Sequence, residues 1–356
     1  MTQPAPAAGT RPAAAPTERG WGKLLLAFAA FIIIPTQLRA LLPVDSAILL
    51  FVPALAACAL VGWWAGGRVA LAVIWLALAV WITAFPVTPT TAFDNLVRGW
   101  SLLLAGAFGL VCLLGDQRPL LARALIAVCI TFVLAAFMSL VGPVTIAQAS
   151  GTVAAEFARR NNETMATLNT MIQLHSQQWS DLVAKVPMLA DLPSKTRDEL
   201  TTLSKAGRAV FPALLALESL AALALAWATY HRLSRTRLGA PLRPLREFRF
   251  NDQLVWGLIV GLTIVLLPTL TTLRGTGKNL LVFFGALYAL RGFGVLTWFM
   301  APGSLAITVG VGFLMLFAPI LNEIAALVFL MLGVAALALG LGDTWADWRH
   351  RARPTP

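Results

Sequence analysis

The sequence predicts an all-α protein: a polytopic transmembrane helix bundle with an extracytoplasmic helical hairpin. Hydrophobic residues make up 58% of the 356 residues, and only 12% are charged. Apolar runs recur from Lys23 to Gly342, and about ten of them approach the ~20 residues that a bilayer span needs. No stretch alternates at period two over the length of a barrel strand. Helices are therefore expected, because they close their backbone hydrogen bonds internally.

The chain divides into segments by composition. Residues 1–20 are rich in Ala, Pro and Thr, cannot bury a core and are expected to be a disordered tail. No small-x-small cleavage site follows Pro35, where the short first span ends, so this span is expected to stay uncleaved. The predicted spans cover residues 23–36, 46–64, 69–85, 97–115, 122–142, 207–231, 253–273, 279–300, 303–319 and 322–342. The predicted segments are a five-span block (21–143), an insert (144–206), the sixth span (207–231), a basic linker (232–252), a four-span block (253–342) and an interfacial tail (343–356).

Positive residues predict the orientation, because loops on the cytoplasmic side carry an excess of Lys and Arg. With ten spans, the segment before the first span, the 232–252 linker and the C-terminal arginines fall on one side. We expect a bacterial cytoplasmic (inner) membrane protein with both termini in the cytoplasm. The net charge of +11 then mostly reflects topology, and no nucleic-acid partner is expected.

The insert at 144–206 is the one sizeable segment outside the predicted spans. Apolar residues at helical spacing predict a first helix from about Val153 to Val183, and Ser194 is expected to cap a second helix. Roughly sixty residues are too few to hold a core of their own. The insert should therefore lie across the mouth of the membrane domain or meet a protein partner with its apolar stripe. A solvated lid without a ligand is the plainer alternative.

Two ionisable residues lie inside predicted spans. Glu218 is about 11 residues into the sixth span and Arg291 about 12 residues into the eighth, so both should lie ~16–18 Å from the outer face. A charge there costs at least ~2.5–3.5 kcal/mol unless it is paired or hydrated. We expect the two to interact, directly or through water or a ligand. Ser219 and Tyr288 join them as candidates for a substrate or ion pathway. The alternative is a structural ion pair.

Polar residues at the outer ends of spans form a second candidate group. They could ring the entrance of an outward cavity, or they could be ordinary interfacial residues. These outer-mouth candidates are Asp94, Asn95, Arg98, Lys278, Asn279, Asn322 and Glu323.

The basic linker predicts contact with the lipid bilayer. Arg243, Arg246 and Arg249 recur at a spacing of three, with apolar residues between them. Such a segment should place its charges among anionic headgroups. Asp252 is expected to cap the seventh span.

Motifs for enzymes and cofactors are missing from the sequence. It contains no Walker loop, His-Glu-x-x-His or Gly-x-Ser-x-Gly pattern. His175 has no carboxylate or cysteine at ligand spacing, and the three cysteines fall inside predicted spans without metal spacing. We expect no enzyme activity, no cofactor and no metal.

The C-terminal third resembles a known family. Residues 244–256 (Pro-Leu-Arg-Glu-Phe-Arg-Phe-Asn-Asp-Gln-Leu-Val-Trp) run into an apolar span, and 278–288 and 341–351 follow in the same pattern. This arrangement resembles the uncharacterised bacterial membrane family called domain of unknown function 2232. The resemblance implies a multi-spanning fold with a helical insert, and it supplies no catalytic residues.

Two functions follow as expectations. The first is transport or membrane binding of a small solute near Glu218 and Arg291, because midplane charges are typical of such sites. The second is a membrane scaffold or assembly factor that docks a protein partner through residues 153–206 or through the basic linker.

Overall fold

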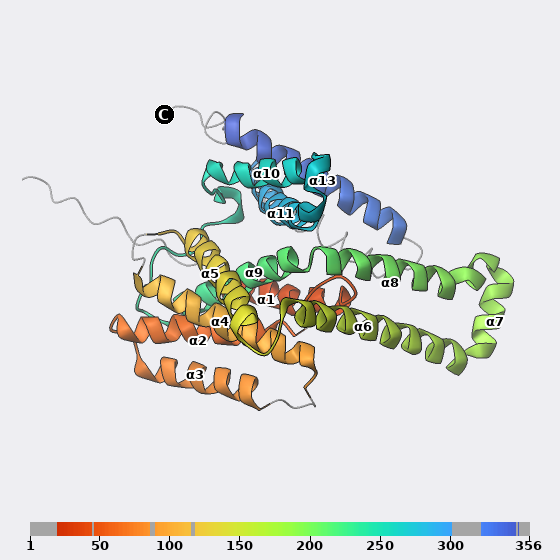
Figure 1. Ribbon diagram of the computed structural model, residues 1–356, viewed down its shortest axis with the longest axis horizontal. Coiled ribbons are helices and arrows are strands. Elements are labelled where there is room, and N and C mark those ends of the chain that lie inside the picture. The colour runs from red at the N-terminus through yellow and green to blue at the C-terminus, as the bar shows by residue number, and fades with distance from the viewer. Residues whose placement is uncertain are drawn as a thin grey trace, which may run out of the picture.

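The computed structural model describes residues 20–44, 46–85, 90–114, 118–300, 322–346 and 348. Within these ranges the chain folds almost entirely into helices and contains no strand (Figure 1). The predicted all-α membrane bundle is confirmed. Residues 1–19 of the expected tail (1–20) and the whole predicted ninth span (303–319) lie outside the described residues.

The other nine predicted spans each coincide with an apolar helix. These helices are α1 (Trp21–Gln37), α2 (Ile48–Trp64), α3 (Val69–Ala84), α4 (Ala92–Leu114), α5 (Leu120–Val141), α9 (Phe211–Leu233), α10 (Val255–Leu266), α11 (Arg274–Phe299) and α13 (Asn322–Ala346). In the part of the chain that the structure describes, four stretches are long and apolar enough to cross a membrane: Ala92–Leu114, Leu120–Val141, Phe211–Leu233 and Pro268–Phe299. Helix α1 does not end at Pro35, which lies inside it.

The bundle is built around α2. This helix packs against α3, α4 and α9, and its apolar side chains are buried along most of its length. Leu55, Phe108, Leu223 and Trp227 lie at the centre of the core. In contrast, α3 leaves most of its large apolar side chains exposed. Such a surface is costly in water, at roughly 25 cal/mol per Å², and it suits contact with lipid.

The C-terminal helices form a second group. Helix α11 packs against α10, α13 and α9, so it joins this group to the rest of the bundle. Gly292 permits the close approach of α11 to α13, because a Cβ at this position would overlap the backbone carbonyl of Ala336. A short 3-10 segment, η4 (Pro268–Leu273), connects α10 to α11.

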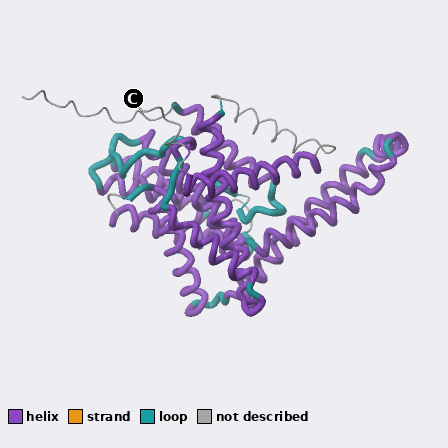
Figure 2. Tube along the Cα trace, turned by 90° about the horizontal axis from the view of Figure 1, so that it is seen from above, coloured by secondary structure: helices purple, strands orange, loops and turns teal. Residues whose placement is uncertain are grey.

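The insert forms a helical hairpin, here called the arm (residues 146–209). It comprises α6 (Ile146–Leu174), α7 (Ser176–Lys185), the 3-10 turn η1 (Pro187–Asp191) and α8 (Leu192–Ala209). Helices α6 and α8 pack together and extend past the end of the bundle, with α7 at the tip (Figures 1 and 2). The arm therefore projects and does not fold back across the bundle.

Two local predictions about the arm were wrong. The first helix begins at Ile146, where Thr145 and Gln148 form a capping box, and it is interrupted at His175. The second helix begins at Leu192, and the hydroxyl of Ser194 donates to the carbonyl of Asp191 at 2.8 Å instead of capping it.

The bundle has two ends with different content. The arm end carries the base of the arm and the loop between α1 and α2. The linker end carries residues 234–254, which include the 3-10 turns η2 (Leu245–Glu247) and η3 (Asp252–Leu254). The start of α1 lies beside this linker, because both line one groove. The end of α13 lies near it too, because Arg291 bonds to Asp252 of the linker and to Asp343 of α13.

Candidate functional site

Glu218 lies on α9 near the arm end and is 8% exposed. One carboxylate oxygen accepts a hydrogen bond from the backbone N–H of Val44, in the loop between α1 and α2, at 3.1 Å. The hydroxyl of the neighbouring Ser219 accepts from the indole N–H of Trp100 at 3.0 Å and donates to the carbonyl of Leu215 at 2.7 Å. Glu218 and Ser219 thus join α9 to the loop and to α4.

Arg291 lies on α11 and is 3% exposed. Its guanidinium donates from Nη1 to Asp252 at 2.5 Å and from Nε to Asp343 at 3.0 Å. The ring of Phe250 lies 5.5 Å from the guanidinium carbon. The side chain of Asp343 is fully buried, whereas that of Asp252 is 59% exposed. Arg291 therefore connects α11 to the linker and to the end of α13.

Tyr288 belongs to this second cluster. Its hydroxyl donates to the backbone carbonyl of Asp252 at 3.5 Å, and its ring packs edge-on against Phe250. Of the four pathway candidates, Glu218 and Ser219 thus fall in one cluster and Arg291 and Tyr288 in another.

The predicted direct pair between Glu218 and Arg291 was wrong. Asn279 of α11 bonds to the carbonyl of Ala209 and to the N–H of Ala213, so Asn279 lies level with the start of α9. From that level Arg291 lies three to seven residues further along its helix than Glu218, or about 5–10 Å at ~1.5 Å per residue. The prediction failed because Asn279 lies level with Ala209 and Ala213 and not with residue 207, the expected start of the sixth span, so Glu218 is nearer to the arm end than Arg291.

A third cluster of charges, which sequence reasoning missed, holds the base of the arm. Arg160 on α6 is 1% exposed and donates to Glu156 at 2.8 Å. It also donates to the backbone carbonyls of Arg39, Leu42 and Pro43, at 3.0–3.2 Å. The rings of Phe93 and Phe157 lie against its guanidinium. We call Arg160 and Glu156 the brace, because they fix the arm to the α1–α2 loop.

The loop is therefore bonded from two sides. Arg160 binds its carbonyl groups and Glu218 binds the N–H of Val44. In the sequence, Glu156 and Arg160 are spaced like any exposed i,i+4 pair on a polar helix. The one signal for burial was Phe157 beside them, and it is too weak to distinguish a brace from a surface pair.

The ionisation of Glu156 reflects this environment. Burial raises the pKa of its carboxyl group, but hydrogen bonds from Arg159 and Arg160 outweigh that effect. The pKa of Glu156 is therefore held below its ordinary value of 4.5, and the carboxylate stays charged at neutral pH.

The outer-mouth candidates bond to their own neighbours. Asp94 accepts from the N–H and hydroxyl of Thr91 and so caps α4, and Arg98 donates to the carbonyl of Thr83. Asn279 joins α11 to α9, as described above, whereas Asn95 and Lys278 are exposed. The backbones of Asn322 and Glu323 begin α13, and their side chains lie outside the described residues.

The basic linker contains little regular helix. Residues 241–250 contain only the turn η2, and the side chains of Arg243, Arg246 and Arg249 are exposed. Contact of these arginines with headgroups stays a prediction. Asp252 does not cap the following turn: the side chain of Asn251 accepts from the N–H of Gln253 at 3.0 Å instead. The carboxylate of Asp252 is thereby left for Arg291.

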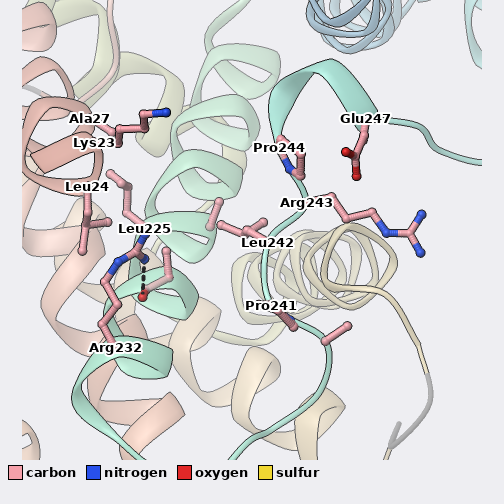
Figure 3. Close-up of a pocket in the computed structure, with 13 residues that line it drawn as sticks. Lys23, Leu24, Ala27, Leu225, Arg232, Pro241, Leu242, Arg243, Pro244 and Glu247 are labelled. Carbon is pink, nitrogen blue, oxygen red and sulfur yellow. Dashed lines mark hydrogen bonds between the residues drawn. The ribbon is translucent and has the colours of Figure 1, made fainter. Parts of the chain in front are cut away.

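A groove of about 560 Å³ opens at the linker end, between α1, α9 and the linker (Figure 3). Its charged residues are Lys23, Arg232, Arg243 and Glu247, and its other nine lining residues are Ala, Leu or Pro. Nη1 of Arg232 donates to the carbonyl of Ala228 at 2.8 Å, which holds the guanidinium beside the apolar wall of α9.

The described part of the chain offers no metal-binding cluster. No three His, Cys, Asp or Glu side chains gather there as metal ligands would. Cys58 and Cys112 are buried among apolar residues, and Cys129 is exposed.

Comparison with known proteins gives a family. Searches of curated proteins and of solved structures found no match. The model of a membrane protein family matches residues 27–337, which include two of the three C-terminal motifs and stop before the third, at 341–351. The span of this match, together with the helical membrane bundle, confirms the resemblance seen in the sequence. The chain belongs to the family described as "Predicted membrane protein (DUF2232)".

Proposed function

We propose that this membrane protein is a non-catalytic scaffold that docks a protein partner through its arm. The observation that carries the proposal is the brace at the base of the arm. Arg160 and Glu156 are both buried there, Glu156 accepts from Arg160, and Arg160 bonds the arm to the α1–α2 loop, while the rest of the arm extends past the bundle (Figure 2).

The cost of the brace supports a role in positioning. Burying two charges costs several kcal/mol, which only good geometry and further hydrogen bonds offset. Arg160 has both, because its guanidinium donates to a carboxylate and to three backbone carbonyls. If the arm were only a solvated lid without a ligand, its attachment to the bundle would not require buried charges.

The distal part of the arm supports a role in contact. Met171 and Leu174 end α6, and Leu182 and Val186 follow in and after α7; all four side chains are exposed. None of the residues of α7 is buried. Contiguous exposed apolar patches mark protein interaction sites, and these four side chains are our candidates for such a patch near the tip of the arm. If the arginine-rich linker end faces the cytoplasm, the partner is extracytoplasmic.

Site-specific photo-crosslinking in native membranes tests this proposal. A photoreactive residue at Leu174, which is 75% exposed, should yield one discrete protein adduct, and Arg160→Gln should diminish it. The matched control is Leu140 on α5, which is 78% exposed and should yield lipid adducts only. The absence of a protein adduct from Leu174, Leu182 and Met171 alike would refute docking through the arm.

Small-solute transport is the second proposal. Glu218 favours it, because a buried carboxylate within an apolar helix is typical of substrate and ion pathways. Transport predicts that a small molecule copurifies with the wild-type protein and is lost from Glu218→Gln without loss of thermal stability. The scaffold proposal predicts the reverse: lower stability, because the bond to Val44 is weakened, and unchanged copurification.

A further inference from the structure

The groove at the linker end combines an apolar wall with basic residues, as a binding site for an amphiphile would. Its apolar wall is formed by Leu24 and Ala27 of α1 together with Leu225 of α9. Lys23 lies near the start of α1 and Arg232 near the end of α9, so both basic side chains lie at the linker end of these two apolar helices. A ligand that fits this order carries a negative group at one end and hydrocarbon at the other.

The charges also point to an anion. Three of the four charged lining residues are basic. Figure 3 shows Lys23 and Arg232 on the side of the groove formed by α1 and α9, with Arg243 and Glu247 across the linker. A phosphate group can bind an ammonium and a guanidinium together, and such charge-assisted hydrogen bonds are about twice as strong as neutral ones.

From these features we infer that the groove binds one anionic phospholipid. The phosphate lies between Lys23 and Arg232, and an acyl chain lies along Leu24, Ala27 and Leu225. A lipid fits better than a free phosphate ion, because most of the groove is apolar and it runs along α1, whose Leu25 and Leu26 side chains are exposed. This site is separate from the arm and does not depend on partner docking.

Native mass spectrometry of the full-length protein in detergent provides the test, with phosphatidylglycerol and phosphatidylcholine as probes. The expected result is one retained phosphatidylglycerol and weaker retention of phosphatidylcholine. Lys23→Gln should weaken phosphatidylglycerol binding about five- to tenfold, as expected for one basic contact with an anionic headgroup. Lys23 is exposed, so this change should leave the fold intact.

Two further variants keep the test decisive. Ala27→Trp fills the groove without changing any charge and should also abolish retention of the lipid. Arg246→Gln removes an exposed arginine of the same linker that does not line the groove, and it should leave binding unchanged.

Three outcomes would overturn the inference. The first is equal retention of the two lipids. The second is unchanged binding by both Lys23→Gln and Ala27→Trp. The third is competition by soluble glycerol phosphate as effective as that by the lipid, which would show a site for a free anion instead.

Discussion

At the scale of single residues, the buried charges of this membrane protein act as connections between segments. Arg160 and Glu218 bond to the α1–α2 loop from two helices, and Arg291 bonds to the linker and to α13. Each charge lies where two or three segments meet. The arrangement is typical of buried ion pairs, which add less to net stability than they cost when one partner is removed.

The brace gives the first prediction. Arg160→Gln should lower the free energy of unfolding by about 3–5 kcal/mol, because the loop carbonyls of Arg39, Leu42 and Pro43 lose their donor and Glu156 keeps only Arg159 as a charged partner. The matched control is Arg159→Gln: its side chain is 45% exposed and Glu156 keeps its bond to Arg160, so the loss should be smaller, at about 1 kcal/mol. Thermal unfolding in detergent measures both. Equal losses in the two variants would show that burial of Arg160 is unimportant.

The second prediction concerns pH. The pKa of Glu156 is lower in the folded protein than its ordinary value of 4.5. The stabilisation is therefore fully present above pH 4.5 and is lost as the pH falls through the lowered pKa. The gap in melting temperature between wild type and Glu156→Gln should be constant from pH 7 to about pH 5 and should shrink at lower pH. A gap that widens on acidification would contradict the assigned direction.

The third prediction separates the Arg291 cluster from Glu218. In a double-mutant cycle, Arg291→Gln and Asp343→Asn should show a coupling energy of about 1–3 kcal/mol, because the two side chains share a buried hydrogen bond. The pair Arg291→Gln and Glu218→Gln should add within about 0.5 kcal/mol. Coupling of Arg291 to Glu218 as strong as that to Asp343 would restore the direct pair expected from the sequence.

At the scale of helices, the contact between α11 and α13 depends on glycine. In membranes small residues let helix backbones approach, because lipid gives apolar side chains no driving force to associate. A Cβ at Gly292 would overlap the carbonyl oxygen of Ala336, and a Cβ at Gly340 would overlap that of Tyr288. Arg291 and Asp343 bond beside this contact, so close packing and the ion pair support each other.

The fourth prediction tests this contact. Gly292→Ala should destabilise the protein by about 1–3 kcal/mol, because the added methyl group forces α11 and α13 apart. Gly285→Ala on the same helix is the matched control, since no atom lies within 4 Å of its added Cβ. The melting temperatures of the two variants should therefore differ. Equal melting temperatures would contradict the close packing at Gly292.

At the scale of the whole molecule, the apolar runs were sufficient to predict the helices but not their contacts. The sixth span was expected to begin at residue 207, but its helix meets Asn279 at Ala209 and Ala213, and this difference placed Glu218 and Arg291 at one depth in the prediction. The turn η4 falls within the run predicted as the seventh span, so hydropathy did not locate the end of α10 at Leu266. Arg160 was missed because its burial depends on residues 39–43, which lie far from it in the chain.

The proposed function depends on the arm standing out from the bundle in a bilayer. Spin labels can be placed at Ser180 in α7 and at Asn95 in α4, which are both exposed. Pulsed electron paramagnetic resonance in lipid nanodiscs would then measure the distance between the tip of the arm and the bundle. Cys129 would be changed to Ser and the two buried cysteines to Ala. We predict one narrow, long distance in the wild type that broadens in Arg160→Gln. A short-distance population in the wild type, with the arm folded over the bundle, would contradict the account.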